Sequence, residues 1–261
     1  MGIKTDKIDF NADAAQGYGV FRNDAETDVI SKVSSVNVSC GFHAGDPLTI
    51  KKVLLTCKEN NVQVGAHVGY QDLAGFGHRP MNLDNDETEA VVLYQIGAVS
   101  SFAKAYSLSV EHVRLHGAMY ERAAKDFDFA LSVANAVKKF DKWMILYMPV
   151  GEIADKVEET AKITVARELF IDKFYDSNAN IVSTGLKPDE DVMLNRIRTV
   201  LYSGKIKIGN GEFLEVKCDS FHFDSKNSDT SGLLDKAREI VLPSPYNYNK
   251  AALSGWTELR V

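Results

Sequence analysis

Histidine residues gather in short segments of the first half of the chain. Five of the six histidines lie between positions 43 and 116. His43, His67 and His116 each follow a short apolar run and have a glycine nearby. Glycine lets a ligand approach the backbone closely, and imidazole can transfer protons near neutral pH or bind a metal ion. These segments predict a site for proton transfer or metal-assisted chemistry.

Acidic and amide side chains accompany this histidine group. Asp9, Asn11 and Asp13 alternate along one segment, so an extended chain would place all three on one side. We therefore expect them to face the same interior as the histidines. Asp46 stands before Pro47 at a later turn, where it would either cap a helix or join the site.

Two arginines bring positive charge to these segments. Arg79 follows His78 in a glycine-rich loop, and Arg114 lies between His112 and His116. Arg79 could grip a carboxylate or phosphate, or it could hold its own loop to an acidic residue. Because side chains alternate along a strand, Arg114 is expected to point into the interior. A buried cation there needs an acidic partner or an anionic ligand. His112, nearer the start of the same segment, is interpreted as structural.

Positioning these residues at one rim requires strands that alternate with helices, and the chain shows that alternation. We expect strands at 7–11, 35–39, 62–66, 111–115, 144–148 and 163–166, and helices after Asp46 and Asp84, at 127–139 and 152–160, after Pro188 and at 232–241. The segments 213–216 and 220–223 are each a strand or together a hairpin. In the helix after Asp84, the spacing predicts an inward stripe of Val91, Tyr94, Ala98 and Phe102.

This alternation implies parallel β–α–β units and an α/β fold. We predict one domain over residues 1–261, an irregular barrel of about seven parallel strands with an irregular tail at 242–261. An open doubly wound sheet is the alternative. The chemistry of such folds lies on loops after the carboxyl ends of the strands. The sequence lacks the GxGxxG and GxxxxGK phosphate-binding motifs.

Composition narrows the class of partner. The chain has 261 residues, with 36 acidic and 30 basic residues and a net charge of −6, which argues against nucleic acid as a ligand. No apolar run is long enough to span a membrane. The three cysteines are far apart, so we expect reduced thiols and a cytoplasmic protein. A small molecule is the expected ligand.

Several motifs occur together in a fixed order. They are DFNADAAQGYG (9–19), CGFHAGDP (40–47), GAHVGYQDLAGFGHRPM (65–81), YQIGA (94–98) and HVRLHGAMY (112–120). Together they resemble the LamB/YcsF family, over about residues 7–205. The segment 166–175 is similar to the family's ExFADRxY motif: Glu168, Asp172 and Tyr175 are retained, and Lys173 stands where arginine is usual. The resemblance implies an irregular β/α barrel related to the glycoside hydrolase and polysaccharide deacetylase barrels.

The family includes the A subunit of bacterial ATP-dependent 5-oxoprolinase, and the resemblance implies that activity. The reaction opens the lactam ring of the small anion 5-oxoproline to give L-glutamate, with ATP and Mg²⁺ as co-substrate. The resemblance also implies partner subunits B and C, and a homo-oligomer is possible. We assign proton transfer and water positioning to Asp13, His43, His67 and His116, and substrate binding to Asp9, Asn11, Asp46, Arg79, Arg114, Asp172 and Lys173.

Some positions depart from the family pattern. Gln16 stands where glutamate is usual, and Arg114 where lysine is usual. Ser183 and Thr184 fall where the family tends to have LVPR, and the segment 221–225 matches a late CVHGD motif poorly. These changes remove titratable groups, so two alternatives stay open. One is a metal-dependent hydrolase with Asp13, His43 and His67 as ligands, and the other is a non-catalytic protein that binds a small anion.

Overall fold

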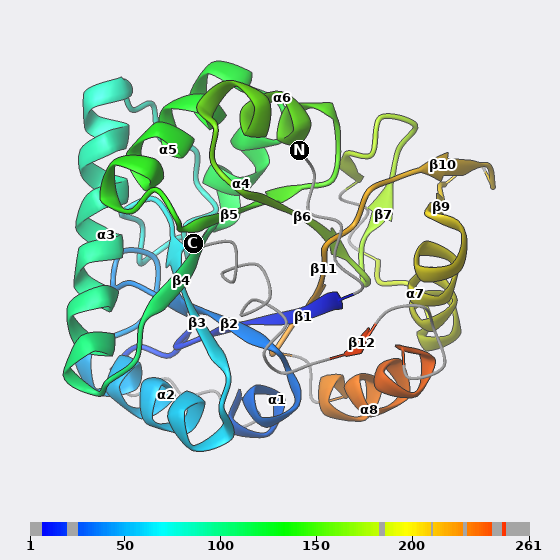
Figure 1. Cartoon of the computed structure of the whole chain (residues 1–261), viewed down its shortest axis with the longest axis horizontal. Helices are drawn as coiled ribbons and strands as arrows, with labels where there is room; N and C mark the ends of the chain where they lie inside the picture. Colours follow the sequence, from blue (N-terminus) through cyan, green and yellow to red (C-terminus); the bar gives the residue numbers. More distant parts are fainter. Residues whose placement is uncertain are drawn as a thin grey trace.

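Parallel strands surround the centre of the molecule and close into a barrel (Figure 1). The barrel strands are β1 (Lys7–Ala14), β2 (Ser35–Ser39), β3 (Gln63–Val68), β4 (Val110–Leu115), β5 (Ile145–Pro149), β6 (Val165–Phe170) and β11 (Ser220–Phe223). Strand β11 pairs with both β6 and β1, which closes the ring. The predicted closed α/β barrel is therefore confirmed. The structure is a computed structural model, and it describes residues 7–19, 26–182, 186–209, 211–226, 229–241 and 247–248.

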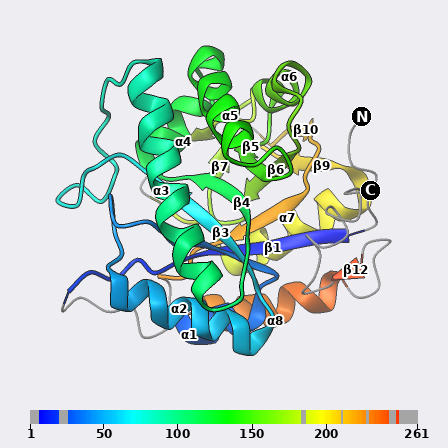
Figure 2. The same cartoon turned by 60° about the vertical axis from the view of Figure 1, so that its left-hand side comes forward.

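Helices pack around the outside of this barrel (Figures 1 and 2). They are α1 (Glu26–Lys32), α2 (Pro47–Asn60), α3 (Asn85–Ala105), α4 (Gly117–Ala123), α5 (Phe127–Phe140), α6 (Glu152–Ala161), α7 (Glu190–Ser203) and α8 (Thr230–Val241). Asp46 and Asp84 cap α2 and α3 as predicted. Helices α1 and α4 were not predicted. None of the helices described combines the length and hydrophobicity needed to cross a membrane.

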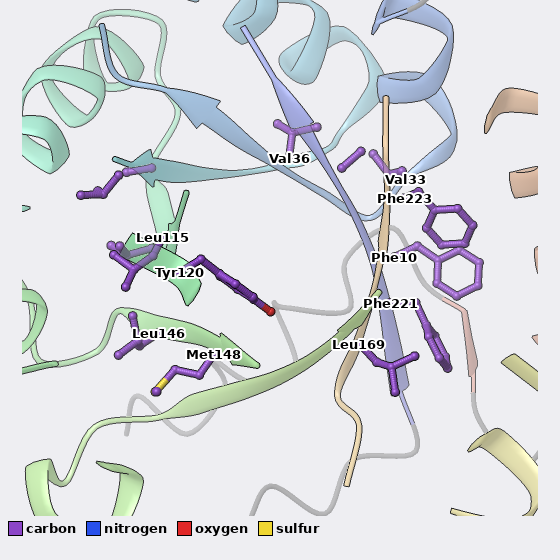
Figure 3. Packing of buried hydrophobic residues seen from close by; sticks show 14 of the residues in the cluster. Phe10, Val33, Val36, Leu115, Tyr120, Leu146, Met148, Leu169, Phe221 and Phe223 are labelled. Carbon is purple, nitrogen blue, oxygen red and sulfur yellow. The ribbon is translucent and has the colours of Figure 1, made fainter. Parts of the chain in front are cut away.

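The period of two along β1 separates a polar interior from an apolar exterior. Asp9, Asn11 and Asp13 point inward and are buried. Phe10 points outward and packs against Phe221 and Phe223 of β11, with ring centroids 6.1 and 4.9 Å away. Figure 3 shows these three rings together on one side of β1 and β11. The predicted alternation is therefore confirmed, and it holds the polar side chains inside a rigid sheet.

The buried face of α3 differs from the predicted stripe by one residue. Its inward residues include Val92, Gln95, Val99 and Ala103. Tyr94 is 65% exposed, and its ring stacks on Phe42 at 5.3 Å. The prediction was wrong because apolar residues occupy neighbouring positions along this helix, so the spacing fits two adjacent stripes equally well.

The second half of the chain also differs from prediction. Strand β6 begins at Val165, because that residue pairs with Leu146, and it runs on to Phe170. The segments 213–216 and 220–223 contain separate strands, as one of the two predicted alternatives had it. They do not form a hairpin, because β10 (Phe213–Glu215) pairs with β9 (Lys205–Lys207). Two other short strands, β7 (Phe174–Tyr175) and β8 (Ile181–Val182), pair with each other.

The predicted irregular tail contains one ordered element. Strand β12 (Asn247–Tyr248) pairs in parallel with the first residues of β1. The other tail residues, 242–246 and 249–261, lie outside the described residues, as do Ser183 and Thr184.

Candidate active site

The carboxyl ends of the barrel strands bring the predicted polar residues together. Asp13 comes from β1, His67 from β3 and Arg114 from β4. His43 follows β2, and His116 follows β4 directly as the N-cap residue of α4. All five are buried. The four residues predicted to carry proton transfer therefore lie in one cluster.

Asp13 is the acidic residue of this cluster. Its Oδ1 accepts hydrogen bonds from Asn37 at 3.0 Å and from Arg114 at 3.1 Å. Its Oδ2 lies 3.2 Å from His67 Nε2 and accepts a hydrogen bond from the Gln16 amide at 3.2 Å. Burial alone would raise the pKa of Asp13, but Arg114 and His67 outweigh it and hold that pKa well below its usual range. Asp13 is therefore a carboxylate at neutral pH.

Gln16 has a physical role beside Asp13. Its amide N–H group donates to Asp13, whereas a glutamate in the same place would set a second carboxylate against the first. Glutamine thus removes a like-charge contact, and it also removes an acid or base from the site.

Arg114 meets the acidic partner that its buried position required. Its Nε lies 2.8 and 2.9 Å from the two carboxylate oxygens of Glu168 on β6. Its guanidinium also stacks over Tyr120 and Phe170, at 4.8 and 5.1 Å from the ring centroids. Because Asp13 and Glu168 both engage this cation, Arg114 neutralises the protein's own carboxylates. The expectation that it grips a substrate anion does not fit this arrangement.

The three histidines pack directly against one another. His116 Nδ1 lies 2.9 Å from His67 Nε2, and the His43 and His116 rings stack at a centroid distance of 3.9 Å. Close glycines make room for them, since a Cβ on Gly69 would stand 2.5 Å from His43 Nδ1. Burial, followed by the neighbouring histidines, lowers the pKa of His43 and lowers that of His116 to about 2.

A cavity of about 580 Å³ opens beside this cluster. Asp13, Arg114 and His116 border it, together with His222 of β11. His43 and His67 lie behind these residues. Its size suits a small organic ligand. Its other charged lining residues include Glu121, Asp172, Lys173, Lys187, Asp224 and Lys226.

Asp172 and Lys173 reach the cavity, as the family resemblance implied. Lys173 Nζ lies 3.6 Å from Asp172 Oδ2, and 43% of the lysine side chain is exposed. Lys187 and Lys226 were missed by the sequence analysis, because each is a single lysine in an irregular segment. These lysines supply the cations with which the cavity can hold a carboxylate or a phosphate.

Asp9 and Asn11 lie deeper in the barrel and do not border the cavity. Asn11 bridges Glu168 and Ser220, with hydrogen bonds of 2.9 and 2.7 Å. Asp9 accepts hydrogen bonds from Ser35, Tyr147 and Ser220. We expected both to bind substrate, but they form supporting layers below Asp13 because the strand alternation stacks them along the barrel.

Asp9 makes stability depend on pH. Burial raises its pKa to about 6, against the lowering effect of its three hydroxyl partners. The protonated form is therefore favoured on folding. Its stabilising contribution is complete below the unfolded pKa of 3.8, and it is lost as pH rises through 6. We expect the wild type to lose up to about 3 kcal/mol from this residue between pH 4 and 7.5.

Urea unfolding of the wild type and of Asp9→Asn at several pH values measures this contribution. The fall in unfolding free energy between pH 4 and 7.5 should be smaller in the asparagine variant by up to about 3 kcal/mol. A fall should remain, because burial raises the pKa of Glu26 to about 7. Equal pH dependence of the two proteins would contradict the assignment.

Asp46 and Arg79 do not join the cluster. Asp46 accepts hydrogen bonds from Leu48 N, Thr49 N and Gly19 N, so it serves as the helix cap and loop anchor. Arg79 Nε donates to Asp72 at 2.8 Å, and 67% of its side chain is exposed. Each had an alternative structural explanation in the sequence, and the contacts favour that explanation.

We therefore expect Arg79→Ala to change turnover by less than about fivefold, since exposed ion pairs contribute little. Steady-state kinetics of the variant checks this. A fall of a hundredfold or more would mean that Arg79 reaches the substrate in the working complex.

The chemistry available here is general acid–base catalysis beside a carboxylate. His116 and Asp13 border the cavity, while His67 contacts both of them. One nitrogen from each of His43, His67 and His116 lies within 4.8 Å of the others, so these rings could also hold a metal ion. The metal site considered from the sequence consisted of Asp13, His43 and His67, whereas the structure brings His116 together with the other two histidines.

Comparison with known proteins places this chain in a family. The model of the LamB/YcsF family matches residues 8–248. The chain belongs to the LamB/YcsF family. Among its relatives, the A subunit of 5-oxoprolinase from Fusobacterium nucleatum is 36% identical over 241 residues, covering 90% of this chain and 93% of that protein. The same protein of Pyrococcus horikoshii is 35% identical over 240 residues, covering 90% and 94%.

Two solved structures share this fold. The lactam utilization protein of Thermus thermophilus superposes with a TM-score of 0.84 at 34% identity, covering 89% of this chain and 96% of that one. A putative cellobiose-phosphate cleavage protein of Enterococcus faecalis V583 gives a TM-score of 0.58 at 11% identity, covering 96% and 99%. The second likeness concerns the fold alone.

Proposed function

We propose that this LamB/YcsF protein is the A subunit of an ATP-dependent 5-oxoprolinase, which opens the lactam ring of 5-oxoproline to give L-glutamate. The observation that carries the proposal is the similarity to proteins of that name over about nine tenths of both chains. The site fits the chemistry, because lactam opening needs a cation for the substrate carboxylate and a group that activates water.

We assign roles from the geometry of the cavity. Asp13 and His116 face the cavity and would position and deprotonate water. His67 contacts both residues and would orient them. Lys173, with Lys187 and Lys226, would hold the substrate carboxylate or the phosphate of the activated intermediate. Arg114 and Glu168 would fix the position of Asp13.

ATP would be the co-substrate, with Mg²⁺ as its usual counterion. Transfer of the γ-phosphoryl group of ATP to the amide oxygen would release ADP and activate the ring carbon. Attack by water on that carbon would then release phosphate and break the ring C–N bond. We propose that subunits B and C act together with this chain, so that the chain alone has little activity. The need for ATP and the three unpaired cysteines support a cytoplasmic location.

Complementation of growth tests this function. A bacterium that lacks its own copy of this protein but keeps subunits B and C should regain growth on 5-oxoproline as sole nitrogen source when it expresses this chain. Failure to grow, while the Fusobacterium nucleatum relative restores growth at equal expression, would count against the proposal.

A further inference from the structure

The hydrogen bonds of His67 and His116 fix where each neutral ring carries its proton. His67 Nδ1 lies 3.3 Å from the carbonyl oxygen of Arg114, and His116 Nε2 lies 2.7 Å from that of Phe76. A carbonyl oxygen can only accept, so each of these nitrogens donates an N–H. The opposite nitrogens, His67 Nε2 and His116 Nδ1, then carry lone pairs. They face each other at 2.9 Å. Arg114 Nη1 lies 3.5 Å from His67 Nε2, at the limit of a hydrogen bond, and Asp13 Oδ2 lies 3.2 Å from the same nitrogen, so a cation held between the two lone pairs would relieve this contact.

His43 is the third histidine of this group. Within the described part of the chain its Nδ1 has no hydrogen-bond partner, and its Nε2 contacts the Ser39 hydroxyl at 3.1 Å. A hydroxyl can donate or accept, so this contact leaves a lone pair of His43 available. A shared proton would relieve only the pair formed by His67 and His116. A metal ion would serve all three rings.

The surrounding charges can compensate a cation. Asp13 and Glu168 contribute two negative charges, and Arg114, which lies between them, contributes one positive charge. These three groups therefore leave one surplus negative charge beside the histidines. Asp13 Oδ2, 3.2 Å from His67 Nε2, is placed to approach an ion or to accept a proton from water bound to it.

We propose that His43, His67 and His116 form a binding site for one divalent transition-metal ion such as Zn²⁺, independently of the lactam chemistry proposed above. Imidazole nitrogens select such ions. Ligating histidines characteristically donate their second N–H to a backbone carbonyl, as His67 and His116 do here. The ligand nitrogens of tetrahedral zinc stand about 3.4 Å apart, so the rings must adjust slightly from their present spacing.

The ion would have an open position toward the cavity that His116 and Asp13 border. There it would supply Lewis acidity to water or to a carbonyl oxygen. The protein's own residues would hold the ion, fix the ring tautomers and keep the Asp13 carboxylate within reach.

Metal binding to the untagged full-length chain tests the site without 5-oxoproline, ATP or partner subunits. After removal of metals with a chelator, equilibrium dialysis against Zn²⁺ should give one ion per chain. His67→Ala and His116→Ala should each weaken binding by more than about 100-fold, because even outer-shell changes cost 10–100-fold. His78→Ala is the matched control, since its ring lies 5.2 Å from His116 but is not among the three, and it should bind normally.

The site is refuted if the wild type binds no stoichiometric ion, if both ligand variants still bind it, or if His78→Ala loses it equally. Circular dichroism checks that each variant is folded. Co²⁺ bound to the wild type gives a second readout that needs no variant. Intense visible absorption of a four- or five-coordinate ion is expected, and the weak spectrum of hexa-aqua cobalt would overturn the proposal. Because no turnover is measured, failure here leaves the 5-oxoprolinase proposal separately testable.

Discussion

Replacing Arg114 with methionine is expected to lower the free energy of unfolding by about 3–5 kcal/mol, the usual cost of breaking a buried ion pair from one side. Arg114 is 2% exposed and lies between the carboxylates of Glu168 and Asp13, at 2.8 and 3.1 Å. Without the guanidinium, two buried carboxylates face each other uncompensated. Urea unfolding of the wild type and of the variant measures the loss.

The pH dependence of this loss of stability distinguishes an electrostatic cause from a packing defect. Arg114 holds the pKa of Asp13 well below its usual range and lowers that of Glu168, in each case against the raising effect of burial. In the variant both pKa values should rise, so the destabilisation should be greater at pH 8 than at pH 5. A purely steric defect would cost the same at both pH values.

Two further variants control the interpretation. Arg114→Lys keeps the charge and should lose much less stability than Arg114→Met. Adding Glu168→Gln to Arg114→Met removes one uncompensated charge and should recover part of the loss, which a double-mutant cycle would report as coupling between the two sites. A loss below about 1 kcal/mol in Arg114→Met would contradict the account.

Replacing His116 with alanine is expected to lower turnover of the assembled enzyme by about 10²–10⁴-fold, the usual contribution of a general acid or base. His116 borders the cavity and contacts His67, which in turn reaches Asp13. The variant loses the imidazole ring that lies between His67 and the cavity. Initial rates of glutamate formation, with all subunits present, measure the effect.

His78→Ala is the comparison for that experiment. His78 also borders the cavity, but its ring stacks on Phe76 and it is not among the three histidines whose nitrogens converge. Its loss should change turnover far less than the loss of His116. Equal defects in the two variants would show that alanine harms this rim in a general way, and the assignment of His116 would fail.

The parts of the site that follow local periodicity could be predicted from the sequence. Alternation along β1 placed Asp9, Asn11 and Asp13 on the inner face. The helix cap at Asp46 followed from its position before proline. These features depend on residues close together in the chain, and strand geometry or capping chemistry determines them directly.

The parts that depend on barrel closure could not be predicted in the same way. Glu168 comes within 2.8 Å of Arg114 although 54 positions separate them. His222 reaches the cavity only because β11 inserts between β6 and β1. The length of each strand and the strand order decide such contacts, and neither leaves a local signal in the sequence.

The depth at which a strand residue lies in the barrel also could not be predicted from the sequence. Asp9 and Asp13 share the inner face of one strand, yet only Asp13 borders the cavity. The depth of a residue in the barrel depends on the stagger between neighbouring strands. Arg79 differs in this respect, because the acidic partner that holds it, Asp72, lies in the same loop, and the sequence left that local explanation open.

The most direct test of the central claim is glutamate formation in a reconstituted mixture. The chain is combined with subunits B and C, ATP, Mg²⁺ and 5-oxoproline, and glutamate and ADP are measured by mass spectrometry. Glutamate is expected only when all three proteins are present, with ADP formed in step with it. Absence of glutamate, in a mixture where the Fusobacterium nucleatum relative supports the reaction with the same B and C, would contradict the claim that this chain is a 5-oxoprolinase subunit.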